Sequence, residues 1–187
     1  MNVSELAPGL WRWTALHPDW KEGEGWEQEV GCVYYEAADA TVLIDPLVPA
    51  EQERFFSALD RDVERRGLPV AVLLTCESHR RSAAELTERY DAGDAPPNGI
   101  EPFVVPELKE TLLWLPEHKT LVVGDVLLGG PDGVRICPDS WLEGASPAAI
   151  HAALRPLLDL PIERVLVSHG EPVLEHGRAA LERALRA

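Results

Sequence analysis

The feature that most constrains the fold is a polar side chain placed directly after each of several short apolar runs. Asp45 follows the run Thr41–Ile44, and Asp125 follows Leu121–Gly124. His169 follows Arg164–Ser168, and the segment Cys76–His79 follows Ala71–Thr75. Strands that lie side by side bring such ends to one edge of a sheet, where α/β proteins build their sites. The sequence therefore predicts an α/β chain with a functional rim at these strand ends.

The remaining segments predict strands mixed with helices. A helix over Gln52–Arg66 has apolar residues on one face, and Gly67 can end it. Ser146 and Pro147 form a good helix start, and Pro156 should end or kink that helix. Further helices are expected over Ser82–Tyr90 and Leu174–Leu185. The expected strands are Gly9–Thr14 at a sheet edge, Gly31–Glu36, Thr41–Ile44, Val70–Thr75, Glu101–Val105, Thr111–Leu115, Thr120–Val123 and Arg164–Val167.

The size of the chain suits one core, because 187 residues leave little room for two. We therefore expect a single domain over residues 1–187. No window is long and apolar enough to span a bilayer, and Met1–Glu5 lacks the features of a signal peptide. Cys32, Cys76 and Cys137 are odd in number and widely spaced, which favours a reducing compartment. These observations predict a cytoplasmic protein.

The charge balance excludes some classes of partner. The chain has 17 basic and 32 acidic residues, a net charge of −15, and no basic run. Nucleic acid and anionic membranes are therefore not expected as partners. Four tryptophans near the N-terminus, Trp11, Trp13, Trp20 and Trp26, are better explained by core or rim packing than by a pocket.

Several motifs resemble those of the metallo-β-lactamase superfamily, in the same order and over most of the chain. Leu6-Ala-Pro-Gly-Leu-Trp11 resembles its first strand, and Val42-Leu-Ile-Asp-Pro46 resembles a strand that ends in a structural aspartate. Trp114–Asp125 is similar to the strand pair whose closing aspartate bridges two metals, and Val165–Pro172 resembles the strand that carries the last histidine ligand. The resemblance implies a four-layer αββα sandwich and a hydrolase that uses metal-activated water.

The ligand positions depart from the family. Its hallmark His-x-His-x-Asp-His falls on Cys76, Ser78, Arg80 and Arg81, and its middle histidine falls near Pro106. Only Asp125 and His169 keep a ligand. Arginine carries a permanent charge and pairs well with carboxylates, so Arg80 or Arg81 is a candidate to neutralise Asp125 in place of a metal.

The first hypothesis is therefore a divergent member that binds a small molecule, acts as a regulatory domain or works by non-metal chemistry. Its ligand-binding rim would consist of Asp45, Arg80, Arg81, Asp125 and His169, and arginine and histidine there favour an anionic ligand. No cofactor is expected in this reading. A purely structural member that persists through oligomerisation is a further reading.

The alternative is a metal-dependent hydrolase of ester, thioester, lactam or phosphodiester bonds with an atypical mononuclear site. Cys76 and His79 are three residues apart, which is a chelating interval, and thiolate and imidazole both bind zinc well. With Asp125 and His169 they would make four ligands. Metal content separates this alternative from the first hypothesis.

Overall fold

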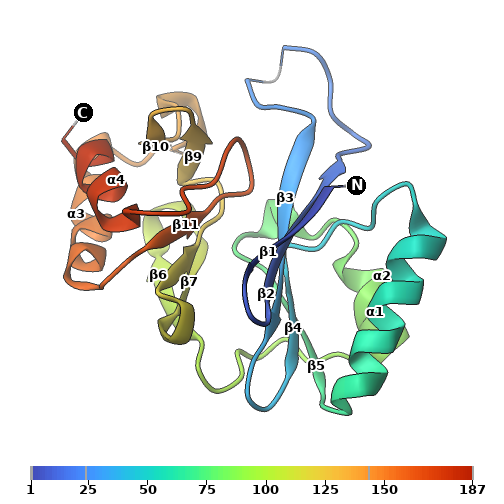
Figure 1. The fold of residues 1–187 in the computed structure, drawn as a ribbon. Helices are drawn as coiled ribbons and strands as arrows, with labels where there is room; N and C mark the ends of the chain where they lie inside the picture. Colours follow the sequence, from blue (N-terminus) through green and yellow to red (C-terminus); the bar gives the residue numbers. More distant parts are fainter. Residues whose placement is uncertain (1, 24, 143, 187) are drawn as a thin grey trace. The chain divides into compact units, whose positions relative to one another are not determined.

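The computed structural model describes residues 2–23, 25–142 and 144–186, and it divides into two compact units. The first unit contains the chain up to Leu74 together with Ser78–Ile100. The second contains Thr75–Glu77 and the chain from Glu101 onward. Each unit is built on its own main sheet (Figure 1). That residues 1–187 form one domain stays a prediction.

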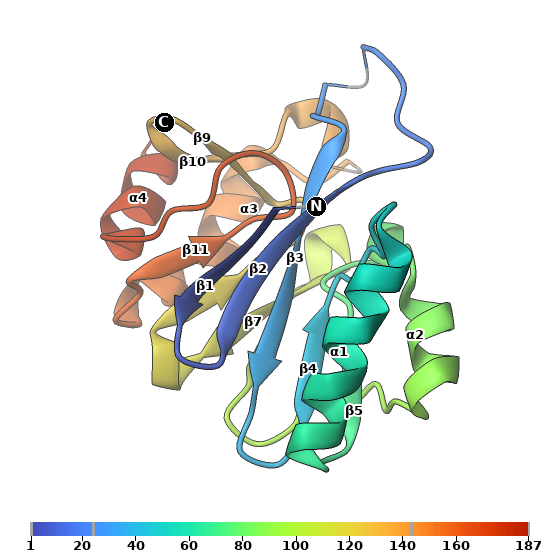
Figure 2. The same ribbon diagram turned by 45° about the vertical axis from the view of Figure 1, so that its right-hand side comes forward.

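The sheet of the first unit has five strands in the order β1-β2-β3-β4-β5. Neighbouring strands are antiparallel except β4 and β5, which are parallel. Figure 2 shows the long strands β1, β2 and β3 side by side. The bounds are β1 Asn2–Ala7, β2 Leu10–Leu16, β3 Glu29–Glu36, β4 Thr41–Ile44 and β5 Val70–Leu73.

Helices α1 (Gln52–Arg66) and α2 (Ala83–Tyr90) cover one face of this sheet. Phe55 and Leu59 of α1 and Leu86 of α2 are buried in one cluster with alternate residues of the strands. Gly67 ends α1 in the left-handed conformation with φ 58°, where its N–H reaches Val63 O, as the sequence predicted. The strand residues of the cluster are Trp13, Ala15, Val30, Cys32, Tyr34, Leu43, Val70 and Val72.

The second unit has a four-stranded sheet in the order β11-β8-β7-β6 and a separate β9–β10 hairpin. Strands β8 and β11 are parallel, and the other pairs of the sheet are antiparallel. The bounds are β6 Glu101–Val105, β7 Glu110–Leu115, β8 Thr120–Val122, β9 Leu127–Gly130, β10 Gly133–Ile136 and β11 Arg164–Leu166.

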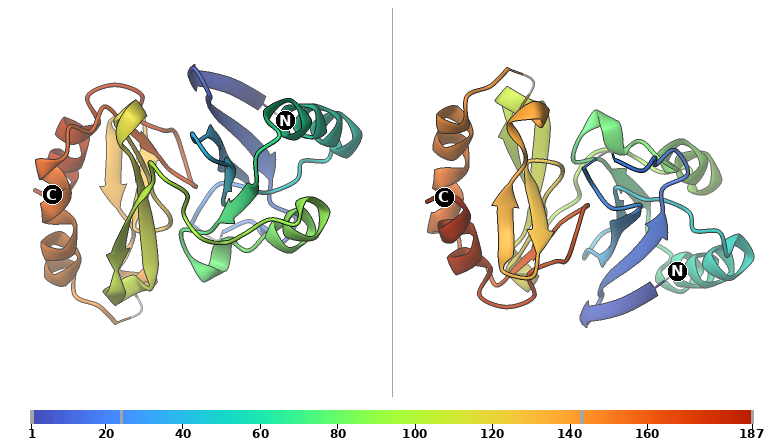
Figure 3. Two further views of the ribbon diagram at one scale, coloured as in Figure 1. Left: turned by 90° about the horizontal axis from the view of Figure 1, so that it is seen from below. Right: turned by 90° about the horizontal axis from the view of Figure 1, so that it is seen from above.

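Helices α3 (Pro147–Leu154) and α4 (Gly177–Ala184) lie on one face of the second sheet (Figure 3). Ser146 caps α3, because its side-chain oxygen accepts the N–H of Ala149 at 3.2 Å. The helix ends at Leu154 and the chain continues as a 3₁₀ turn over Arg155–Asp159, which contains Pro156. Each unit therefore consists of one sheet layer and one helical layer.

Two expectations about the strands were wrong in detail. Gly9–Thr14 was expected at a sheet edge, but β2 pairs with β3 on one side and with β1 on the other. Strand β1 is the actual edge, and its largely exposed, polar sequence gave no strand pattern. The β9–β10 hairpin was also missed, because Gly129, Gly130 and Gly133 are typical of loops.

The terminal helix begins at Gly177 rather than Leu174, since His176 takes the left-handed conformation just before it.

Among the described residues, no helix has the length and apolar character needed to cross a membrane.

Candidate functional site

The parallel pair β4–β5 brings two polar residues together in the first unit. Asp45 directly follows β4, and His79 lies in the short segment that follows β5. The Nδ1 atom of His79 lies 3.0 Å from Oδ2 of Asp45, and both side chains are buried. Asp45 has φ 48°, a left-handed conformation that aspartate tolerates better than most residues. The turn after β4 thus aims the carboxylate at the imidazole.

Arg81 donates hydrogen bonds to the main chain of the same unit. Its Nη1 donates to the carbonyl oxygens of Asp45, at 3.0 Å, and of Gly31, at 3.2 Å. It also lies 3.9 Å from the Sγ atom of Cys32. Arg81 therefore fastens the turn after β4 to strand β3. This is a structural task that the sequence did not suggest.

The parallel pair β8–β11 brings two polar residues together in the second unit. Asp125 lies three residues after β8, and His169 lies three residues after β11. Nε2 of His169 lies 3.2 Å from Oδ1 of Asp125, and the imidazole is nearly buried. The Sγ atom of Cys76 lies 3.9 Å from the other oxygen of Asp125, Oδ2. Thiol, carboxylate and imidazole therefore meet at Asp125.

Two glycines hold this cluster in place by allowing close approach of main chains. The N–H of Gly129 donates to the carbonyl of His169 at 2.9 Å. A Cβ on Gly170, which has φ 83°, would lie 2.4 Å from the carbonyl oxygen of Gly129. A Cβ on Gly129 would in turn lie 1.9 Å from the carbonyl oxygen of Glu171. Side chains at these positions would push β9 and the His169 loop apart.

Sequence reasoning missed two residues beside this cluster. Trp141 packs its ring edge against His169, with ring centroids 6.1 Å apart. Glu110, at the start of β7, is a buried carboxylate. Burial, together with the charges of Glu110 and Asp125, raises the pKa of Cys137 from its ordinary 9.0 to about 11. An acidic residue directly before the apolar run 111–115 was the only signal for Glu110, whereas nothing in the sequence pointed to Trp141.

The sequence-predicted residues therefore fall into two groups. Asp45, His79 and Arg81 meet in the first unit, and Cys76, Asp125 and His169 meet in the second. Arg80 is exposed. Pairing of Asp125 with Arg80 or Arg81, and membership of His79 in a ligand set with Cys76, Asp125 and His169, stay predictions.

The second-unit cluster fits a single zinc ion by the chemistry of its donors. Zinc prefers thiolate, imidazole and carboxylate ligands in tetrahedral arrangement, at bonds of about 2.0–2.3 Å, so its ligand atoms lie about 3.3–3.8 Å apart. The Sγ–Oδ2 distance from Cys76 is 3.9 Å and the Nε2–Oδ1 distance from His169 is 3.2 Å, so the two donors approach different oxygens of Asp125 at distances close to that range. Without a metal, the thiol of Cys76 and Nε2 of His169 can each donate to the carboxylate of Asp125.

Comparisons with known proteins give matches among solved structures. No protein-family model matches the sequence, and no curated protein matches it. The NDM_FIM-1-like metallo-β-lactamase from Erythrobacter litoralis in its mono-zinc form is 20% identical, over 99% of this chain and 94% of that one, with a TM-score of 0.63. VMB-1 is 15% identical, over 98% of this chain and 97% of that one, with a TM-score of 0.59. A metallo-β-lactamase family protein from Thermus thermophilus is 17% identical, over 97% of this chain and 80% of that one, with a TM-score of 0.55.

Proposed function

We propose that this chain, which has the metallo-β-lactamase fold, is a hydrolase with a single-metal site built on Cys76, Asp125 and His169. The observation that carries the proposal is the approach of two zinc-type donors, Cys76 and His169, to the carboxylate of Asp125, with each of the three residues on a separate loop of one unit. The sequence alone favoured a metal-free binding protein. The distances of Cys76 and His169 to Asp125 support the metal-dependent alternative, because a cysteine in place of the first histidine ligand supplies a donor rather than removing one.

The residues of this cluster would each do a distinct task. Cys76, Asp125 and His169 would bind the ion, and the carbonyl of His169, held by Gly129, would fix the direction of the imidazole. A zinc ion bound there would supply Lewis acidity, which polarises a carbonyl or phosphoryl oxygen and lowers the pKa of water. The ring edge of Trp141 would limit the access of water to His169.

Asp45 and His79 form a second carboxylate–imidazole pair, within the first unit. A carboxylate on Nδ1 fixes the tautomer and direction of an imidazole, an arrangement that commonly accompanies metal-binding and proton-transferring histidines. Because Nδ1 of His79 is bound to Asp45, any metal or substrate proton would be taken by Nε2. That His79 belongs to a ligand set with Cys76, Asp125 and His169 stays a prediction.

One of the similar solved structures bears on the number of metal ions. The Erythrobacter litoralis protein is described in a mono-zinc form, so one ion suffices to occupy this fold there. We infer a substrate with an ester, thioester, lactam or phosphodiester bond, as the fold family implies.

The three cysteines are thiols and not parts of disulfides, which supports a cytoplasmic location.

Cobalt binding tests the site directly, because thiolate ligation gives Co²⁺ an intense charge-transfer absorption. Titration of the metal-free protein with Co²⁺ should produce that absorption with one equivalent. Cys76→Ser should abolish the absorption, and His169→Gln should weaken binding at least about ten-fold. His151→Gln, on α3 of the same unit, is the matched control and should bind as the wild type does. Absence of any cobalt spectrum in the wild type would overturn the proposal.

The second candidate function is metal-free binding of a small anionic molecule, and one observation favours it. Nε2 of His169 lies 3.2 Å from Oδ1 of Asp125, a contact that needs no metal. That Arg80 and Arg81 provide positive charge for a carboxylate or phosphate ligand stays a prediction. Thermal-shift titrations with phosphate and small carboxylates distinguish the two functions. Stabilisation of chelator-treated protein that is lost in Arg80→Gln favours the metal-free function, whereas stabilisation by zinc alone favours the hydrolase.

A further inference from the structure

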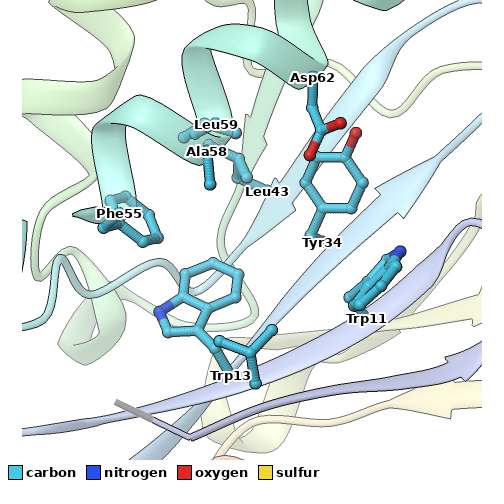
Figure 4. A pocket seen from close by; sticks show the side chains of 9 residues that line it. Trp11, Trp13, Tyr34, Leu43, Phe55, Ala58, Leu59 and Asp62 are labelled. Carbon is cyan, nitrogen blue, oxygen red and sulfur yellow. The ribbon is translucent and has the colours of Figure 1, made fainter.

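The first unit contains a pocket that shares no residue with the candidate site. Its volume is about 280 Å³, close to the lower end of the range for small-molecule sites. It lies between helix α1 and the β1–β3 side of the sheet, and its walls are mostly apolar (Figure 4). The rings of Trp11, Trp13, Tyr34 and Phe55 form much of these walls.

The strand register explains why these rings meet. Trp11 pairs with Tyr34 across β2 and β3, and Tyr34 pairs with Leu43 across β3 and β4. Residues in register lie on the same face of a sheet, so the two rings form one row beneath α1. Val3 pairs with Trp13 and lines the pocket from the edge strand β1. Helix α1 does not fill the space above this end of the row of side chains, and that space is the pocket.

Hydrogen bonds and ring contacts hold the side chains that line the pocket in fixed positions. Trp13 donates its indole N–H to the carbonyl of Leu47 at 2.9 Å, and its ring lies 5.6 Å from that of Phe55. The hydroxyl of Tyr34 donates to Oε1 of Glu36 at 3.1 Å. Burial and the carboxylates of Glu36 and Asp62 raise the pKa of Tyr34, so this hydroxyl stays protonated. A pocket with fixed walls loses little conformational entropy when a ligand binds.

One carboxylate lies at the polar end of the pocket. Asp62 of α1 lies beside the hydroxyl end of Tyr34 (Figure 4), and its side chain is 46% exposed. The contacts recorded for it within the described part of the chain are those of Arg65, at 3.2 and 3.3 Å, and both fall on Oδ1. The guanidinium of Arg66 is engaged by Glu36 and by main-chain carbonyls. Oδ2 of Asp62 is therefore the acceptor that the pocket offers to a ligand.

We propose that this pocket binds a small organic cation, with an aromatic or aliphatic body among the four rings and a protonated amine on Asp62. Aromatic faces attract cations, and tryptophan does so most strongly. The net charge of −15 concentrates cations around the molecule and repels anions. A carboxylate at the mouth adds a charge-assisted hydrogen bond for an N–H donor. This ligand class differs from the substrate of the proposed hydrolase and does not depend on it.

Three probes of similar shape test the charge preference. Phenethylammonium, neutral 2-phenylethanol and anionic 3-phenylpropionate should be titrated at one pH while tryptophan fluorescence is followed. We expect the cation to bind at least about ten-fold more tightly than the neutral probe, and the anion to bind most weakly. Equal affinities for the three probes, or no binding of the cation at millimolar concentration, would overturn the proposal.

Two pairs of variants assign the binding to this pocket. Asp62→Asn should abolish the preference for the cation, whereas Glu64→Gln removes a charge from an exposed position of the same helix and should leave the preference unchanged. Ala58→Leu should fill the pocket and weaken all probes, while Ser57→Leu, its exposed neighbour outside the lining, should not. All four positions lie on α1 and outside its buried face, so folding should be retained and circular dichroism can verify it. Wild-type behaviour of both Asp62→Asn and Ala58→Leu would contradict the assignment.

Discussion

Nε2 of His169 lies 3.2 Å from Oδ1 of Asp125, although the two residues are far apart in the sequence. Each residue follows one strand of the parallel pair β8–β11. The first unit repeats this relationship, because Asp45 and His79 follow the parallel pair β4–β5 and lie 3.0 Å apart. Parallel strands end at the same edge of a sheet, so each pair delivers one carboxylate and one imidazole to a common point.

Substitutions at Asp45 should separate the hydrogen bond from the backbone conformation. Asp45→Asn keeps an acceptor for His79 and tolerates the left-handed φ, so we expect a loss of less than about 1 kcal/mol in the free energy of unfolding. Asp45→Ala removes the buried acceptor and strains the turn, which should cost about 2–4 kcal/mol. Urea unfolding measures both values. Equal stabilities of the two variants would show that the His79 contact and the turn contribute little.

Alanine at Gly170 should disturb the candidate site through the backbone. The added Cβ would meet the carbonyl of Gly129 at 2.4 Å and would sit at a positive φ, so a loss of about 2–4 kcal/mol is expected. Gly130→Ala is the control, because its Cβ would meet no atom within 4 Å and its φ is not positive. Thermal unfolding with Gly170→Ala as stable as Gly130→Ala would contradict the close approach.

Two buried thiols predict a loss of stability at high pH. Burial raises the pKa of Cys32 and of Cys137 from 9.0 to about 11 in the folded protein. Thiols of the unfolded chain ionise near 9, so this contribution is fully present below pH 9 and is lost as the pH rises through 11. Urea midpoints at about pH 8 and about pH 10.5 should differ less in the double variant Cys32→Ala/Cys137→Ala than in the wild type. The same difference in both proteins would argue against the thiols as its cause.

The expectation of one domain also has a direct test. If residues 1–187 fold cooperatively, circular dichroism and tryptophan fluorescence should report one coincident unfolding transition, and the calorimetric and van't Hoff enthalpies should agree. Trp13 belongs to the core of the first unit and Trp114 to that of the second. Single-tryptophan variants that retain one or the other should therefore unfold at the same urea concentration. Two separate midpoints would show two independent domains.

The fold class and helix α1 were the parts of the structure that the sequence predicted best. The metallo-β-lactamase fold expected from the motifs is confirmed by the matches among solved structures. The bounds of α1 were predicted to the residue, because its apolar face and Gly67 are strong local signals. Strand β1 and the β9–β10 hairpin were not predicted, since their pairing is decided by neighbours rather than by their own polar or glycine-rich sequences.

The partners of the site residues were harder to predict than their positions. Charge alone suggested Arg80 or Arg81 for Asp125, and that pairing stays a prediction; the donation of Arg81 to the main-chain carbonyls of Asp45 and Gly31 was not expected. Acceptors of the main chain carry no sequence signature, and a positive φ such as that of Arg81 cannot be read from an arginine. The favoured interpretation of core packing is confirmed for Trp13, and Trp11 and Trp13 also line a pocket.

The most direct test of the proposed function is the metal content of protein purified without a chelator. Elemental analysis after dialysis against trace zinc should give about one equivalent of zinc in the wild type and in His151→Gln. Cys76→Ser and His169→Gln should retain much less, because each removes one of the two donors that approach Asp125. A wild-type protein that holds well below one equivalent, and no more than these two variants, would contradict the single-metal site.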